Sequence, residues 1–191
     1  MYNYKFDPEL TITDKVALEF LEEGMNLSEN GMSFNEDAQK QVISKIINGN
    51  LININLSKYT KDDLNISNSL TPENFLVNLF SSTKDLDNSK MTEETVFLYD
   101  YLLTHNKDML SQIDENANIY QLYLDQIIKL KIPPTMVDKF VNYINAINAE
   151  IEILNIYSQT DVDVVATVQA MSIATEIDTI LANSYFKLLE R

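Results

Sequence analysis

Two long segments with periodic apolar residues, near the C-terminal end of the 191-residue chain, constrain its fold most. In the first segment, residues 134–157, apolar side chains recur at alternating spacings of three and four, which is the pattern of a helix with one apolar face. They are Val137, Phe140, Ile144, Ile147, Ile151 and Leu154. The second segment, residues 161–190, follows a short polar break. We therefore expect two helices that form a long antiparallel hairpin.

The second segment carries a stripe of small side chains at intervals of four residues. The stripe consists of Ala166, Ala170 and Ala174. Small side chains let another helix approach closely, and Ile173 and Ile177 add bulk beside them. Thr160 is expected to cap this helix, because a threonine hydroxyl accepts hydrogen bonds from the first free N–H groups. We predict that both segments are packing surfaces and carry no reactive group.

The remaining chain, residues 1–132, is predicted to be helical with two short strands. The expected helices begin near Thr13, Ser33, Pro72, Thr92 and Ala117, and Gly24 and Gly49 are expected to end the first two. Tyr2–Phe6 and Leu51–Leu56 alternate in polarity and are expected to pair as a small two-stranded β element. The sequence thus predicts a mainly α fold, in which residues 1–132 and the hairpin of residues 133–191 form a multi-helix bundle.

Side chains that support catalysis are few in this sequence. The chain has no cysteine, a single histidine (His105), a single arginine (Arg191) and three isolated glycines. Catalytic triads and metal sites need clustered partners, and phosphate-binding loops need clustered glycines. Carboxylate pairs such as Glu150 with Glu152 are expected on solvated polar faces. We predict a protein that is not an enzyme and carries no cofactor.

One acidic segment approaches a calcium-loop pattern. Its potential ligands are Asp85, Asp87, Ser89 and Glu93. The glycine that such a loop needs at its sixth position is replaced by Lys90, and the bidentate glutamate at its twelfth is replaced by Val96. An ammonium group inside the loop opposes a bound cation. The prediction is therefore a solvated acidic loop and no metal site.

The charge and hydropathy of the chain bound its partners. The formal net charge is −15 at neutral pH, so the sequence has no basic stripe of the kind that binds nucleic acid specifically. The first ten residues lack the apolar core of a signal peptide. The uncharged run from Val164 to Thr175 is short for a membrane span. We expect a soluble protein of the cytoplasm or of a virion, without membrane or specific nucleic-acid partners.

Three classes of function fit these observations. The first is a structural subunit of a larger symmetric assembly, a homo-oligomer such as a head-tail connector or neck protein of a bacteriophage, where an acidic lining would repel passing DNA. The second is an acidic inhibitor or regulator that mimics nucleic acid and acts on a basic partner protein. The third is an enzyme of unknown type. The broad apolar seams and the scarcity of catalytic side chains favour the first class.

Overall fold

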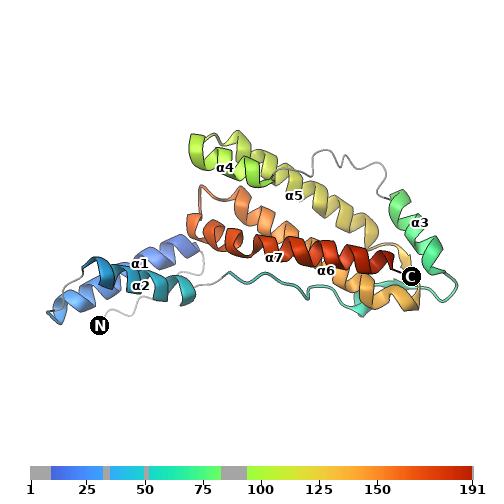
Figure 1. The fold of residues 1–191 in the computed structure, drawn as a ribbon, viewed down its shortest axis with the longest axis horizontal. Coiled ribbons are helices and arrows are strands. Elements are labelled where there is room, and N and C mark those ends of the chain that lie inside the picture. The colour runs from blue at the N-terminus through green and yellow to red at the C-terminus, as the bar shows by residue number, and fades with distance from the viewer. Residues whose placement is uncertain (1–9, 32–34, 50–51, 83–93, 191) are drawn as a thin grey trace.

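The computed structural model describes residues 10–31, 35–49, 52–82 and 94–190. These residues form seven α-helices and two short strands (Figure 1). The helices are α1 (Ile12–Glu29), α2 (Glu36–Gly49), α3 (Pro72–Ser82), α4 (Glu94–Thr104), α5 (Asp108–Ile127), α6 (Val137–Ser158) and α7 (Val164–Leu189). The strands are β1 (Asn65–Ile66) and β2 (Lys131–Ile132). The predicted mainly α fold with a small two-stranded β element is confirmed.

The centre of the fold is α6, which packs against α5 on one side and α7 on another. Every side chain from Tyr143 to Ile151 is buried. A helix that is buried all round needs neighbours on several faces, and α5, α7 and the extended segment before β1 supply them. Phe140 packs edge-to-face on Phe75 of α3 with ring centroids 5.4 Å apart. We call α4–α7 the body.

The start of α7 differs from the prediction. Asp163, and not Thr160, is its N-cap, because the Asp163 carboxylate accepts a hydrogen bond from the Ala166 N–H at 3.0 Å. Thr160 is buried in the turn between α6 and α7, where its hydroxyl donates to the Tyr157 carbonyl at 2.6 Å. The threonine therefore completes the end of α6 instead of the beginning of α7.

The strands also differ from the prediction. Tyr2–Phe6 lie outside the described residues. Residues 52–60, which we call the strap, run along the body with a turn at residues 56 and 57, and no strand forms between 52 and 56. The Ile52, Asn55 and Tyr59 N–H groups donate instead to side chains of α6 and α7. The sheet is formed by β1 and β2, which pair in parallel with Asn65 opposite Lys131.

Several predicted helix boundaries are wrong. Helix α1 continues through Gly24 to Glu29, and its N-cap is Thr11, whose hydroxyl accepts from the Asp14 N–H. The helix predicted from Ala117 begins at Asp108, because α4 stops at a break where His105 has a φ of 55°.

The predicted caps Ser33 and Thr92 lie outside the described residues. Pro72 and Gly49 do stand at the start of α3 and the end of α2.

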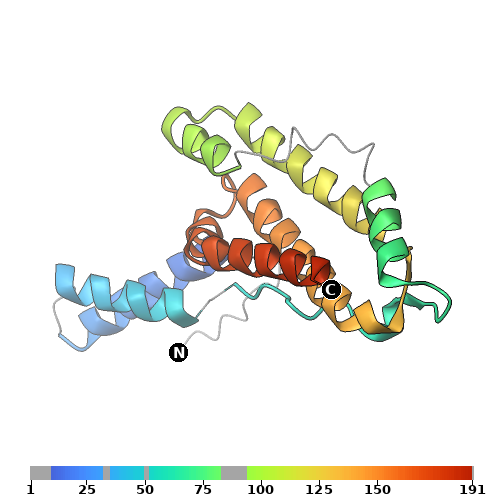
Figure 2. The same cartoon turned by 45° about the vertical axis from the view of Figure 1, so that its right-hand side comes forward.

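Helices α1 and α2 form an arm that projects from the body at the end where α6 joins α7 (Figures 1 and 2). The two helices pack on each other, and α1 also contacts α7. Among the arm side chains that the structure describes, Val42 alone is buried. The arm therefore has almost no core of its own in these residues.

Candidate functional site

The predicted packing residues lie where the body is densest. Val137, Phe140, Ile144, Ile147, Ile151, Leu154, Ala166, Ala170 and Ile177 are buried, and Ile173 and Ala174 are half-buried. All of them except Ala166 belong to one of two apolar clusters, one that reaches α3 and β2 and one that reaches α4. These positions hold the body together, and Ile147 also lines a hollow.

The weak calcium candidates Asp85, Asp87, Ser89 and Glu93 lie outside the described residues. Within the described ranges, no group of three or more histidine, cysteine, aspartate or glutamate side chains could hold a metal ion. His105 is exposed at the end of α4, and its ring meets Tyr101 edge-on at 6.1 Å. The single histidine thus marks a helix end in this structure.

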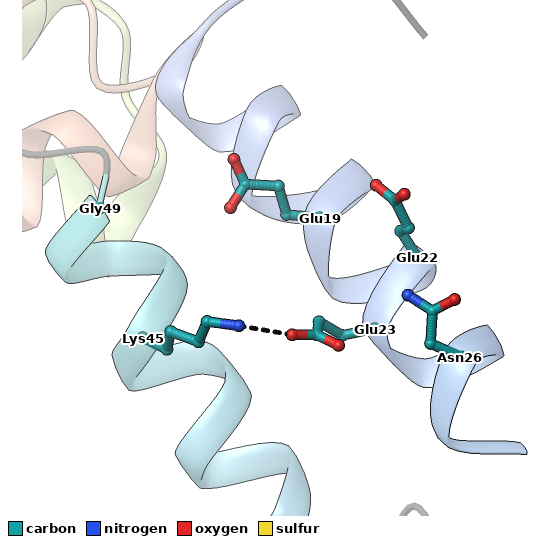
Figure 3. Close-up of a pocket in the computed structure, with 6 residues that line it drawn as sticks. All are labelled: Glu19, Glu22, Glu23, Asn26, Lys45 and Gly49. Atoms are coloured by element: carbon teal, nitrogen blue, oxygen red, sulfur yellow. Dashed lines mark hydrogen bonds and ion pairs between the residues drawn. The ribbon is translucent and has the colours of Figure 1, made fainter. Parts of the chain in front are cut away.

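The arm contains an open hollow of about 470 Å³ between α1 and α2 (Figure 3). Lys45 of α2 reaches across it to the Glu23 carboxylate of α1 at 2.6 Å. The hydrogen bond to Glu23 raises the pKa of Lys45. Glu19, Glu22 and Asn26 complete the wall. Exposed ion pairs of this kind contribute little free energy, and the hollow combines no groups that suggest chemistry.

A second hollow, of about 370 Å³, lies between α5, α6 and α7, and we call it the tyrosine groove. Its walls are Tyr120, Tyr123, Tyr143, Tyr185, Ile147, Asp178, Leu181 and Ala182. The Tyr123 and Tyr143 hydroxyls are 2.6 Å apart and hydrogen-bonded. The Tyr143 and Tyr185 rings are tilted at 43° with centroids 5.7 Å apart. Three helices therefore present aromatic surface to one space.

Three carboxyl groups from three helices meet beside this groove. Glu150 of α6, Asp178 of α7 and Glu94 of α4 interact electrostatically with one another. Glu150 is only 8% exposed. Burial, followed by the charges of Asp178 and Glu94, raises the pKa of Glu150 to about 8. Glu150 is thus protonated at neutral pH and hydrogen-bonds with Asp178.

The prediction that Glu150 lies on a solvated face was wrong. Its Oε2 atom is buried and has no hydrogen-bond partner among the described residues. Burial also raises the pKa of Tyr120, and the charges of Glu150, Glu94 and Asp178 add to this effect. The tyrosine is therefore a neutral phenol. Glu152, the other member of this carboxylate pair, accepts hydrogen bonds from the Asn55 N–H and the Asn148 amide.

Sequence patterns give partial signals for the groove. Tyr120 and Tyr123 are three residues apart on α5, and Asp178, Ala182 and Tyr185 are spaced by four and three on α7. Each spacing places its members on one helix face. The meeting of the two faces depends on how α5 and α7 flank α6, and no local pattern contains that information.

A polar junction attaches the arm to the body. The Asp163 carboxylate that caps α7 also accepts hydrogen bonds from the Ile12 and Thr13 N–H groups at 2.7 and 3.1 Å. The Thr13 hydroxyl donates to Asp163 and accepts from the Val165 N–H. Burial alone would raise the pKa of Asp163, but the hydrogen bonds from Ala166, Thr13 and Ile12 lower it. One carboxylate thus caps two helices.

Comparison with known proteins adds no family and no relative. No protein-family model, no curated protein and no solved structure matches the chain. By length and composition alone, α7 is a candidate membrane span, with a mean hydropathy of 1.3 in its most apolar window. Core helices of soluble proteins have the same property, and α7 packs on α6 in this structure.

Proposed function

We propose that this chain is a non-catalytic subunit of an assembly made from copies of itself, and that a neighbouring copy covers the arm. The observation that carries the proposal is the exposed apolar face of α1. Leu18, Leu21 and Met25, spaced by three and four, lie on one helix face, and Leu21 and Met25 are 62% and 63% exposed. A two-helix arm with one buried side chain among those described gains stability when such a face is covered.

The matching surface that we propose is the first half of α7. Val164, Val168 and Met171 are exposed and have the same spacing of four and three. The run from Val164 to Thr175 contains no charged residue. Two copies that each carry a net charge of −15 repel one another, and an uncharged face is where the acidic α1 can approach with least repulsion. Both faces offer a narrow seam of the kind found in coiled coils.

The contact that we propose joins two different surfaces, α1 of one copy and α7 of the next. Head-to-tail contacts of this type close into rings when the rotation between copies permits. The α7 surface belongs, in this proposal, to an antiparallel hairpin of α6 and α7, because only five residues separate the two helices. A bacteriophage connector or neck protein remains a prediction, and no described feature specifically favours the regulator or enzyme alternatives.

The test is the molar mass in solution, measured by light scattering or sedimentation. We expect the wild-type 21.9 kDa chain to form oligomers, and Leu21→Glu and Val168→Glu each to dissociate them. Leu103→Glu is the matched control, because Leu103 is an equally exposed leucine (63%) on α4, away from both faces. A wild-type monomer at the highest soluble concentration, or equal loss of assembly in the control, would overturn the proposal.

A further inference from the structure

The tyrosine groove combines aromatic faces with negative charge. Tyr120, Tyr123, Tyr143 and Tyr185 supply the faces from three helices. Asp178 stands in the wall, and the buried Glu150 lies beside it with an unpartnered Oε2. In the part of the chain that the structure describes, no lysine pairs with Glu94, Glu150 or Asp178. The described residues therefore provide no positive charge in the groove to balance these acids.

We propose that the tyrosine groove binds a guanidinium group carried on an aliphatic stem. A planar cation is attracted to tyrosine faces within about 6 Å, and arginine-type cations occupy such positions more often than lysine does. The Asp178 carboxylate at the wall is a matching acceptor, since guanidinium donors pair with carboxylates in a planar fork. Ile147 and Leu181 offer apolar surface to the stem.

Other ligand classes fit the groove less well. An anion would face three carboxyl groups, and a metal ion finds no sufficient ligand group within the described ranges. Burial raises the pKa of Tyr120, Tyr123 and Tyr143, so these three side chains are neutral and offer aromatic rings instead of phenolate charge. A purely apolar ligand would remove Asp178 from water with only Glu150 as its hydrogen-bond partner, which costs free energy. An organic cation can contact both the tyrosine rings and the Asp178 carboxylate.

The chain itself is a poor source of this group. Its single arginine, Arg191, lies outside the described residues, so the guanidinium comes, in this proposal, from a small molecule or from an arginine side chain of another protein chain. Both sources share the same head group.

The groove lies along the second half of α7, between Asp178 and Tyr185, whereas the proposed assembly uses the first half. The two proposals can therefore fail separately.

Titration calorimetry with three probes tests the inference. Ethylguanidinium and arginine amide are expected to bind, and citrulline amide, the neutral isostere, is expected to bind at least tenfold more weakly.

The variants Asp178→Asn and Tyr185→Leu are each expected to lower the affinity for arginine amide at least tenfold. Asp62→Asn and Tyr99→Leu are the controls, because both residues are exposed and lie outside the groove. Equal binding of citrulline amide, no binding of either cation, or unchanged affinity in Asp178→Asn would overturn it.

Proton release provides an independent readout. Glu150 faces Glu94 of α4, Tyr120 of α5, Tyr157 of α6 and Asp178 of α7. A cation in the groove favours the ionised form of Glu150, which is protonated at neutral pH before binding. The binding heat should therefore depend on the ionisation enthalpy of the buffer, and this dependence should vanish in Glu150→Gln. Binding heats that are independent of the buffer in the wild type would contradict the placement of the cation beside Glu150.

A peptide with one arginine between neutral residues distinguishes the two sources. Tighter binding of the peptide than of arginine amide assigns the groove to an arginine side chain of a partner protein. Binding of arginine amide with exclusion of the peptide assigns it to a free guanidinium compound.

The variant Leu21→Glu is expected to retain guanidinium binding even if it dissociates the assembly. Loss of binding in this variant would show that the groove needs the neighbouring copy, which contradicts a site formed by α5, α6 and α7 of a single chain.

Discussion

The body and the arm are both built from α-helices, yet they bury very different shares of their side chains. In α6, every residue from Tyr143 to Ile151 is buried, whereas Val42 alone is buried among the described side chains of α1 and α2. Both regions form regular α-helices, and their backbones exchange hydrogen bonds with side chains of the other region at the junction. The difference shows that helix formation and the stability of tertiary packing are separate properties. The body is stabilised by its own core, and the arm depends on contacts at its edges.

The largest expected effect compares truncations in the two regions. Phe140→Ala removes a fully buried ring that packs on Phe75, and losses of this kind cost about 3–5 kcal/mol. Leu21→Ala in the arm is expected to change the free energy of unfolding by less than about 0.5 kcal/mol in dilute monomer. Denaturant unfolding measures both values. Similar losses in the two variants would mean that the arm has a core of its own.

A second experiment asks whether the pH dependence near neutrality belongs to the body. The pKa of Glu150 rises from 4.5 in the unfolded chain to about 8 in the folded one. The folded state therefore holds a proton that the unfolded state has lost, so stability falls as pH rises from 4.5 to 8.

Glu150→Gln should remove most of this decline and raise stability at pH 8 by on the order of a few kcal/mol. Asp178 and Glu94, whose pKa values burial also raises, contribute in the same direction. Glu176→Gln, an exposed change on α7, is the control. Unfolding measured across this pH range gives the result, and a parallel decline in wild type and Glu150→Gln would place the titrating group elsewhere.

The smallest expected effect concerns the junction between the two regions. Thr13→Val removes the hydroxyl that donates to Asp163 and accepts from Val165, at a cost of about 1 kcal/mol. We expect faster amide exchange in α1 with little change in α6. Thr13→Ser keeps the hydroxyl and should preserve protection. Exchange rates that rise equally in α6 would show that the arm and the body unfold together.

Acid should loosen the same junction. The pKa of Asp163 is lowered in the folded state, so its contribution is present above its ordinary pKa of 3.8 and is lost as pH falls through the folded value. This direction is opposite to that of Glu150. The arm is therefore expected to be released from the body at acidic pH, under conditions in which the carboxyl cluster beside the tyrosine groove is fully protonated.

The sequence predicted α6 better than α1 for a physical reason. In α6, the apolar residues from Val137 to Leu154 repeat over successive helical turns, so the residues that the pattern predicts to be buried are buried in the structure. In α1, Gly24 looked like a helix end, but a helical glycine costs only about 1 kcal/mol and the contact with α2 spans it. Glu150 was missed because its burial depends on α4 and α7, which are distant in sequence. The tyrosine groove was missed for the same reason, because its side chains come from three different helices.

The strap has a consequence for the tolerance of the chain to mutation. Side chains of Gln169, Glu152 and Asn145 accept from its backbone at Ile52, Asn55 and Tyr59. Helices α6 and α7 therefore bind this segment by its backbone, in addition to the side chains that pack on the apolar clusters. Proline, which lacks an N–H, should be rejected at these three positions and accepted more readily at the exposed Asn53. A one-residue insertion would displace every donor from its acceptor. The spacing of the strap is therefore more constrained than the identity of its exposed residues.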